Sequence, residues 1–222
     1  MSGEERGAGR LLPSRLYAIA DADVAARAGW VLPDLADAYL QAGARFLQVR
    51  AKDAPSADLL RWIDDLAAHA TPDTWIIVND RVDVALAAGV RRVHLGQDDL
   101  PAIDARRLLG PSGVIGLSTH TDRQVDDACG LPIDYIAVGP VFGTRTKATG
   151  YAPVGTALVR AAREAVTARE GPPIVAIGGV TLERAAEVID AGADAVVVIS
   201  DLLAGGSPTA RVRAFLRELG EA

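Results

Sequence analysis

Residues 174–200 read IVAIGGVTLERAAEVIDAGADAVVVIS, and this stretch decides the fold. A β-branched run over Ile174–Gly179 precedes a segment with helical periodicity, Thr181–Ala191, and a second β-branched run follows over Ala195–Ser200. Gly192 lies where the helix must end, as glycine commonly does. Two strands joined by a helix predict a parallel unit, because parallel strands need a crossover of about this length.

The same alternation of strand and helix extends over most of the chain. The predicted strands are Tyr17–Asp21, Phe46–Arg50, Trp75–Asp80, Arg92–Gly96, Val114–Thr119, Tyr135–Val141, Ile174–Gly179 and Ala195–Ser200. The predicted helices are Pro33–Ala42, Ser56–His69, Val82–Ala88, Pro101–Leu109, Asp122–Cys129, Pro153–Ala168, Thr181–Ala191 and Pro208–Leu219. Eight such units predict an α/β fold, a (β/α)8 TIM barrel that forms a single catalytic domain over residues 14–222. Residues 1–13 are expected to be a disordered leader.

An open, doubly wound sheet is the alternative fold. It would normally use fewer strands and carry a glycine-rich fingerprint after the first one. Here Asp21, Ala22 and Asp23 follow the first predicted strand instead. The barrel is therefore favoured.

Composition excludes several functional classes. The chain has 222 residues, with 23 Lys and Arg against 29 Asp and Glu, and this net charge of −6 argues against a nucleic-acid-binding protein. No apolar run approaches the roughly 18 residues of a membrane span. The single cysteine forms no internal disulfide, so the cytoplasm is the expected location.

Polar and glycine residues cluster where the predicted strands end, and in a barrel these ends converge on one face. Gln48, Arg50 and Lys52 alternate along one strand, so their side chains share its inner face. Two cations there call for an anion such as phosphate or pyrophosphate. An ion pair with Asp21 or Asp80 explains them equally well.

Carboxylates follow two neighbouring strands, at Asn79-Asp80 and at Asp98-Asp99. Magnesium prefers one or two carboxylates combined with phosphate oxygens, so these acids are candidate Mg²⁺ ligands. Helix N-capping before Pro101 is the alternative role for Asp98 and Asp99, and spacing does not choose between them.

Gly178 and Gly179 after the seventh strand, with Ile199 and Ser200 after the eighth, match the place where barrels often bind phosphate. Residues 144–147 supply hydroxyl groups and cations that suit either a lid or a solvated connection. His120 follows the fifth strand and suits proton chemistry, although an orienting role fits as well. His94 lies within a strand and is interpreted as a core histidine.

Seven motifs, in order along the chain, resemble the thiamine-phosphate synthase family. They are YAIAD (17–21), QVRAK (48–52), NDR (79–81), HLGQDD (94–99), GLSTH (116–120), GPVFGTRTK (139–147) and AIGGV (176–180). The resemblance implies a Mg²⁺-dependent barrel transferase of thiamine biosynthesis. It would join 4-amino-5-hydroxymethyl-2-methylpyrimidine pyrophosphate to 4-methyl-5-(2-hydroxyethyl)thiazole phosphate and release pyrophosphate.

The resemblance also assigns residue roles. Asp80 and Asp99 would bind Mg²⁺, with Asp98 as the capping acid. The residues that would hold the pyrimidine pyrophosphate are Gln48, Arg50, Lys52, Asn79, Ser118 and Lys147, of which Arg50, Lys52, Ser118 and Lys147 are the candidate catalytic residues. Those that would hold the thiazole phosphate are Thr144, Thr146, Gly179, Ile199 and Ser200. Ala20 stands where the family usually has a threonine, so one hydroxyl is absent near the site.

Two other functions remain open at this point. A related thiazole tautomerase would use His120 for proton transfer but would need no metal–pyrophosphate site. A non-catalytic barrel that binds a phosphate ligand would have little use for carboxylates beside a cationic loop. The apolar helix faces of a small barrel also allow a homodimer.

Overall fold

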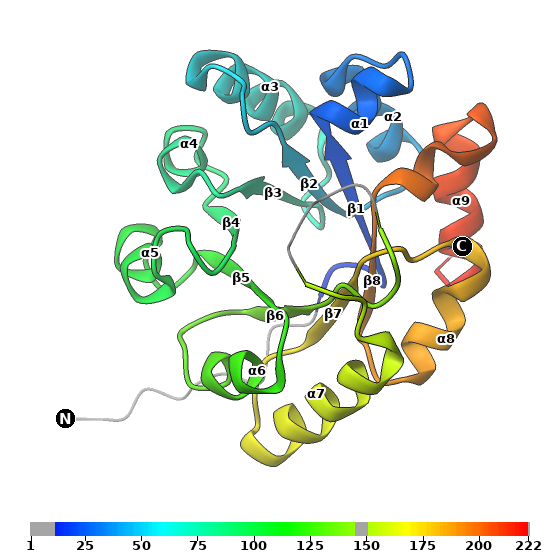
Figure 1. Cartoon of the computed structure of the whole chain (residues 1–222). Helices are drawn as coiled ribbons and strands as arrows, with labels where there is room; N and C mark the ends of the chain where they lie inside the picture. The colour runs from blue at the N-terminus through cyan, green and yellow to red at the C-terminus, as the bar shows by residue number, and fades with distance from the viewer. Residues whose placement is uncertain (1–11, 145–150, 222) are drawn as a thin grey trace.

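The computed structural model describes residues 12–144 and 151–221. In this part of the chain, eight parallel strands close into a barrel in sequential order, with the last strand paired to the first (Figure 1). The strands are β1 Leu16–Asp21, β2 Phe46–Arg50, β3 Trp75–Asn79, β4 Arg92–Leu95, β5 Val114–Thr119, β6 Tyr135–Val138, β7 Ile174–Ile177 and β8 Ala195–Val198. The predicted (β/α)8 barrel is confirmed. The predicted leader lies outside the described residues except for Leu12 and Pro13.

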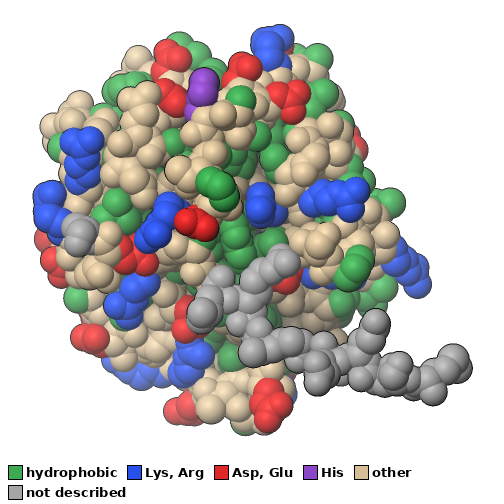
Figure 2. Space-filling view, turned by 180° about the vertical axis from the view of Figure 1, so that it is seen from behind, with side chains coloured by type: hydrophobic (Ala, Val, Ile, Leu, Met, Phe, Trp, Pro, Cys, Tyr) green, Lys and Arg blue, Asp and Glu red, His purple; other side chains and the backbone are tan. Residues whose placement is uncertain are grey.

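Helices surround the barrel (Figure 1). They are α1 Ala22–Arg27, α2 Leu32–Gln41, α3 Ser56–His69, α4 Val82–Ala87, α5 Ala102–Leu109, α6 Asp122–Ala128, α7 Gly155–Arg169, α8 Ala185–Asp190 and α9 Pro208–Glu218, with 3-10 helices η1 Leu182–Arg184 and η2 Ser200–Gly206. Among the described residues, no helix is both long enough and apolar enough to cross a membrane. Figure 2 shows the molecule from behind, and there basic and acidic side chains are intermingled rather than separated by sign.

Alternation along each strand divides the core into two layers. Leu47 and Val49 of β2 belong to the large cluster between strands and helices. Their neighbour Phe46 points into the barrel, where its ring stacks on that of Tyr17 with 3.6 Å between ring centroids. Gln48 is also buried inside and donates to the Tyr17 hydroxyl. Gln48 and Arg50 therefore share the inner face of β2 as predicted, whereas Lys52 lies beyond the end of the strand and is half exposed.

Several strands end earlier than the sequence predicts, at the polar residues themselves. β3 stops at Asn79 because Asp80 adopts a left-handed conformation with φ of 62°. β7 stops at Ile177 because Gly178 and Gly179 also have positive φ, at 106° and 63°. These residues thus belong to the loops that follow the strands.

Two short helices were not predicted. The side chain of Asp21 accepts a hydrogen bond from the Val24 N–H at 3.0 Å and so caps α1, which begins directly after β1. η2 begins at Ser200, where the sequence indicated the end of a strand. Short turns of this kind lack the long apolar periodicity on which helix prediction depends.

Two similar ion-pair clusters, which we call the lower-rim clamps, tie the helices to the amino-terminal ends of the strands. Asp134 lies directly before β6, contacts the Arg106 guanidinium of α5 at 2.6 Å and accepts the Ile115 N–H of β5 at 2.8 Å. The second clamp repeats this arrangement before β8 with Asp194, Arg163 and Ile174. Each carboxylate therefore joins one helix and one neighbouring strand.

Replacing the first of these carboxylates should weaken the fold without affecting the opposite end of the barrel. We expect Asp134→Ala to lower the free energy of unfolding by about 1–3 kcal/mol, because the Ile115 N–H loses its acceptor. Urea denaturation of the wild type and the variant measures this difference. An unchanged denaturation midpoint would show that the clamp contributes nothing.

Candidate active site

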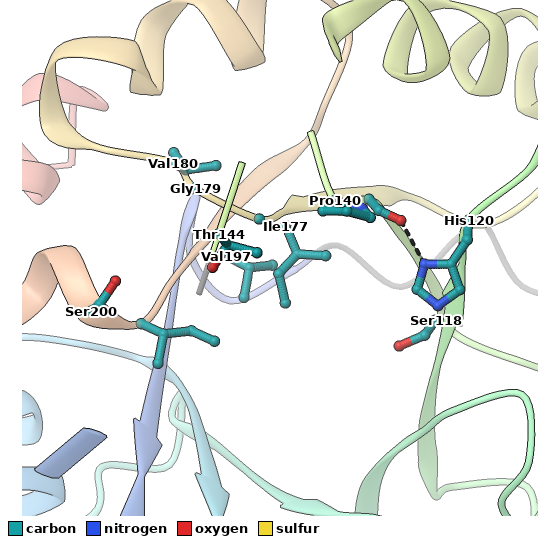
Figure 3. Close-up of a pocket in the computed structure, with 12 residues that line it drawn as sticks. Ser118, His120, Pro140, Thr144, Ile177, Gly179, Val180, Val197 and Ser200 are labelled. Carbon is teal, nitrogen blue, oxygen red and sulfur yellow. Dashed lines mark hydrogen bonds between the residues drawn. The ribbon is translucent and has the colours of Figure 1, made fainter. Parts of the chain in front are cut away.

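The loops that follow the strands enclose two adjoining pockets. The first, the rim pocket, is shown in Figure 3, and the residues that line it include Ser118, His120, Gly139, Thr144, Gly179, Ile199 and Ser200. The second, the inner pocket, reaches into the barrel, and its lining includes Tyr17, Asp21, Gln48, Arg50, Asn79, His94 and Ser118. Ser118, Ile177, Val197 and Ile199 line both. The two pockets thus have part of their lining in common, so two ligands bound there would lie side by side.

The cations of β2 and of the loop after it are held by carboxylates. Arg50 forms an ion pair with Asp21, whose side chain is only 2% exposed. The Lys52 ammonium lies 3.6 Å from a carboxylate oxygen of Asp80 and is half exposed. Both ion pairs that the sequence offered as an alternative explanation are therefore present. Arg50 and Asp21 both line the inner pocket, and Lys52 and Asp80 lie in the loops that follow β2 and β3.

The two candidate metal-binding acids lie at the ends of adjacent strands. The Asp80 N–H donates to the His94 carbonyl at 2.9 Å, which fixes this residue beside β4. Asp99 accepts the Gly96 N–H at 2.7 Å, directly after β4. Within the described ranges, no group of three His, Cys, Asp or Glu side chains could hold a metal. Two carboxylates suit a cation that is shared with ligand oxygens.

The prediction that Asp98 or Asp99 caps the next helix is wrong. The N-cap of α5 is Pro101, and no side chain forms a hydrogen bond there. The helix begins at Ala102, so both acids lie too early in the chain to reach its first N–H groups.

Ser118, Gln48 and Asn79 all line the inner pocket. His94 is a core histidine, 7% exposed, and its Nε2 lies 2.9 Å from the Ser118 hydroxyl. The sequence did not indicate that Tyr17 and Tyr135 would join this group. They are 118 residues apart, yet their hydroxyls meet at 2.9 Å inside the barrel.

The rim pocket collects the predicted phosphate-binding residues Thr144, Gly179, Ile199 and Ser200. A Cβ added to Gly179 would lie 2.6 Å from the Gly143 carbonyl oxygen, so only glycine fits at this point. The predicted residues Thr146 and Lys147 lie outside the described residues.

His120 stands at one side of the rim pocket. Its Nδ1 donates to the Gly139 carbonyl at 2.5 Å, as the dashed line in Figure 3 marks, and its ring stacks on Tyr151 with centroids 4.2 Å apart. A neutral imidazole that donates through Nδ1 presents an unprotonated Nε2. These two contacts orient the ring at the edge of the rim pocket.

Comparison with known proteins identifies clear relatives. A family model described as "Thiamine monophosphate synthase" matches residues 16–202. A thiamine-phosphate synthase of Koribacter versatilis is 40% identical over 207 residues, which cover 92% of this chain and 95% of that protein. One from Shouchella clausii is 40% identical over 214 residues, covering 95% and 98% of the two chains.

A solved structure agrees with these relatives. The thiamine phosphate pyrophosphorylase of Pyrococcus furiosus superposes with a TM-score of 0.80 at 28% sequence identity. The match covers 95% of this chain and 97% of that one, so the likeness extends over the whole barrel.

Proposed function

Because the chain belongs to the thiamine monophosphate synthase family, we propose that it transfers the pyrimidinylmethyl group of 4-amino-5-hydroxymethyl-2-methylpyrimidine pyrophosphate to the nitrogen of 4-methyl-5-(2-hydroxyethyl)thiazole phosphate. The products are thiamine phosphate and pyrophosphate. The observation that carries this proposal is the pair of adjoining pockets that share Ser118 in their lining, with the Arg50–Asp21 ion pair in the lining of the inner one.

The inner pocket would hold the pyrimidine pyrophosphate. Arg50 and Lys52 would exchange part of their contact with Asp21 and Asp80 for contact with the diphosphate oxygens. Such preorganised donors stabilise the negative charge that develops on the leaving group. Gln48, Asn79 and Ser118 would orient the pyrimidine, and Lys147 would add a further cation. No protein nucleophile is required, because the amino group of the pyrimidine stabilises the cation that forms.

Asp80 and Asp99 would hold Mg²⁺. The fit rests on the chemistry of the donors: two carboxylates, fixed at the ends of β3 and β4, with a lysine beside Asp80 that would bind the same diphosphate. When bound, the ion would supply positive charge that weakens the bond to the leaving pyrophosphate.

The rim pocket would hold the thiazole phosphate. Gly179, Ile199 and Ser200 lie on the loops after β7 and β8, where backbone N–H groups can reach phosphate oxygens. Thr144 and Thr146 would add hydroxyl donors. The nitrogen of the thiazole ring would then face the pyrimidine where the two pockets adjoin. Holding the two substrates in this alignment makes their reaction effectively unimolecular.

The test is to incubate the protein with both substrates, with and without Mg²⁺, and to measure thiamine phosphate and pyrophosphate. A synthase forms both products in equal amounts, and only with the metal. A tautomerase would instead isomerise a thiazole carboxylate phosphate without releasing pyrophosphate. A binding protein would do neither, and either of these results would refute the proposal.

One substitution tests the rim pocket separately. We expect Gly179→Ala to raise the KM for the thiazole phosphate about tenfold, because the new Cβ would displace the Gly143 carbonyl and narrow the pocket. The KM for the pyrimidine pyrophosphate should change little. Steady-state kinetics with each substrate varied in turn measures both constants.

Gly205→Ala is the matched control. Gly205 also has a positive φ, at 77°, but a Cβ there would meet nothing within 4 Å. It therefore carries the same kind of backbone strain without blocking the pocket. If both variants raised the KM equally, or if neither did, the rim pocket would not be the thiazole site.

A further inference from the structure

A continuous chain of hydrogen bonds crosses the interior of the barrel. The Gln48 amide donates through Nε2 to the Tyr17 hydroxyl at 2.5 Å, and this hydroxyl lies 2.9 Å from that of Tyr135. The Tyr135 hydroxyl is 3.1 Å from Nδ1 of His94. Nε2 of the same ring lies 2.9 Å from the Ser118 hydroxyl, which faces both pockets. We call these five side chains the interior relay.

The relay is almost entirely buried, and all its members except Tyr135 line the inner pocket. Its members are at most 8% exposed, the most accessible being Ser118 at the pocket wall. Burial raises the pKa of Tyr17 and of Tyr135 well above the usual value. Both phenols therefore keep their proton throughout the working pH range, so each has one hydrogen to donate.

Counting these protons fixes the direction of the relay. Tyr17 already accepts from Gln48, and the other hydroxyl that it contacts among the described residues is that of Tyr135. With Gln48 as the donor, a Tyr17 proton directed at Tyr135 has an acceptor, whereas the reverse assignment leaves that buried proton without one among the described residues. In this assignment Tyr135 keeps its own proton to donate to Nδ1 of His94. A neutral imidazole that accepts at Nδ1 carries its proton at Nε2.

We propose that Tyr17, Tyr135 and His94 are positioning residues that hold His94 in the Nε2–H form and so direct the hydroxyl proton of Ser118 into the inner pocket. Nε2–H donates to the Ser118 oxygen, which leaves the serine proton to hydrogen-bond an acceptor atom of the ligand. This inference rests on the proposed function, in which Ser118 contacts the pyrimidine pyrophosphate.

The opposite tautomer would have the opposite effect. With the proton on Nδ1, His94 would accept the serine proton at Nε2, and Ser118 would offer the ligand only lone pairs. The Tyr135 hydroxyl excludes that state, because its donation keeps Nδ1 unprotonated. The hydrogen bond from the Tyr135 hydroxyl thus sets the tautomer of His94, and the tautomer sets the direction of the Ser118 proton at the pocket.

The tautomer can be measured directly in the ligand-free protein. Long-range ¹H–¹⁵N NMR correlations distinguish Nδ1–H from Nε2–H imidazole, and the chain has only three histidines to assign. We expect His94 to be Nε2–H in the wild type and to lose that preference in Tyr135→Phe. An Nδ1–H form in the wild type, or an unchanged spectrum in the variant, would overturn the proposal.

Kinetics supply the second test. Tyr135→Phe keeps the ring, which packs edge-on against Phe46 at 5.5 Å, and removes only the hydroxyl. The KM for the pyrimidine pyrophosphate should rise about tenfold, as expected for loss of one hydrogen bond. The KM for the thiazole phosphate should stay constant. In a Ser118→Ala background the same change should have no further effect.

Tyr39→Phe is the matched control, since Tyr39 is equally buried but its hydroxyl has no hydrogen-bond partner among the described residues. It should leave both KM values unchanged. A rise in both KM values with Tyr135→Phe, or an undiminished effect without the serine hydroxyl, would show a merely structural role. The NMR result does not depend on turnover, so a failure of the proposed function is recognised separately.

Discussion

Arg50→Ala is expected to lower turnover about 10²- to 10³-fold, the size of effect seen when one preorganised donor to a developing negative charge is removed. Arg50 lines the inner pocket, where it would meet the diphosphate. The same change should destabilise the fold by about 3 kcal/mol, because it leaves the Asp21 carboxylate buried without its cation. Steady-state kinetics and urea denaturation measure the two effects on one preparation.

A double variant separates catalysis from stability. Adding Asp21→Asn removes the uncompensated charge, and the asparagine can still cap α1 by accepting the Val24 N–H. Stability should return towards that of the wild type while turnover stays low. Recovery of turnover in the double variant would show that Arg50 acts only by supporting Asp21.

The second large effect concerns the two carboxylates at the ends of β3 and β4. We expect Asp80→Asn and Asp99→Asn each to lower turnover at least roughly 10²-fold and to raise the Mg²⁺ concentration needed for half-maximal rate. Asparagine keeps the size of the side chain, and at position 99 it can still accept the Gly96 N–H. Initial rates over a range of Mg²⁺ concentrations give both quantities.

Asp98→Asn is the control for this pair. Asp98 belongs to the same loop, and it neither caps α5 nor is proposed to bind the metal. Replacing this carboxylate should leave the Mg²⁺ concentration for half-maximal rate unchanged. A wild-type response to Mg²⁺ in both Asp80→Asn and Asp99→Asn would exclude these carboxylates as the metal site. Calorimetric titration of Mg²⁺ in the presence of the pyrimidine pyrophosphate gives an independent measurement.

The sequence predicts the barrel well because its pattern is local. β2, β5 and α3 have the predicted bounds, since apolar alternation and helical periodicity are properties of a few adjacent residues. α1 was missed because Asp21-Ala22-Asp23 looks like a loop until the Asp21 side chain is seen to cap a helix of six residues.

The candidate site could be predicted only in part, for a related reason. Arg50 and Lys52 stand out because cations on the inner face of a strand are rare. No sequence signal indicates the interior relay, because its two tyrosines look like ordinary core residues. Their hydroxyls meet only because closure of the barrel brings β1 and β6 together across the interior. The sequence also cannot decide whether Arg50 forms an ion pair or binds a ligand. That decision needs the position of Asp21 relative to Arg50, which spacing along the chain does not give.

The lower-rim clamps have an evolutionary consequence. Asp134 and Asp194 directly precede strands, whereas nearly all residues that line the two pockets follow a strand or lie between its middle and its carboxyl-terminal end. Tyr17, near the start of β1, is the exception. The two clamps therefore stabilise the barrel at the end opposite the pockets. Selection can therefore exchange side chains in the upper loops without altering these two clamps. The same fold can thus acquire a new activity without first being destabilised.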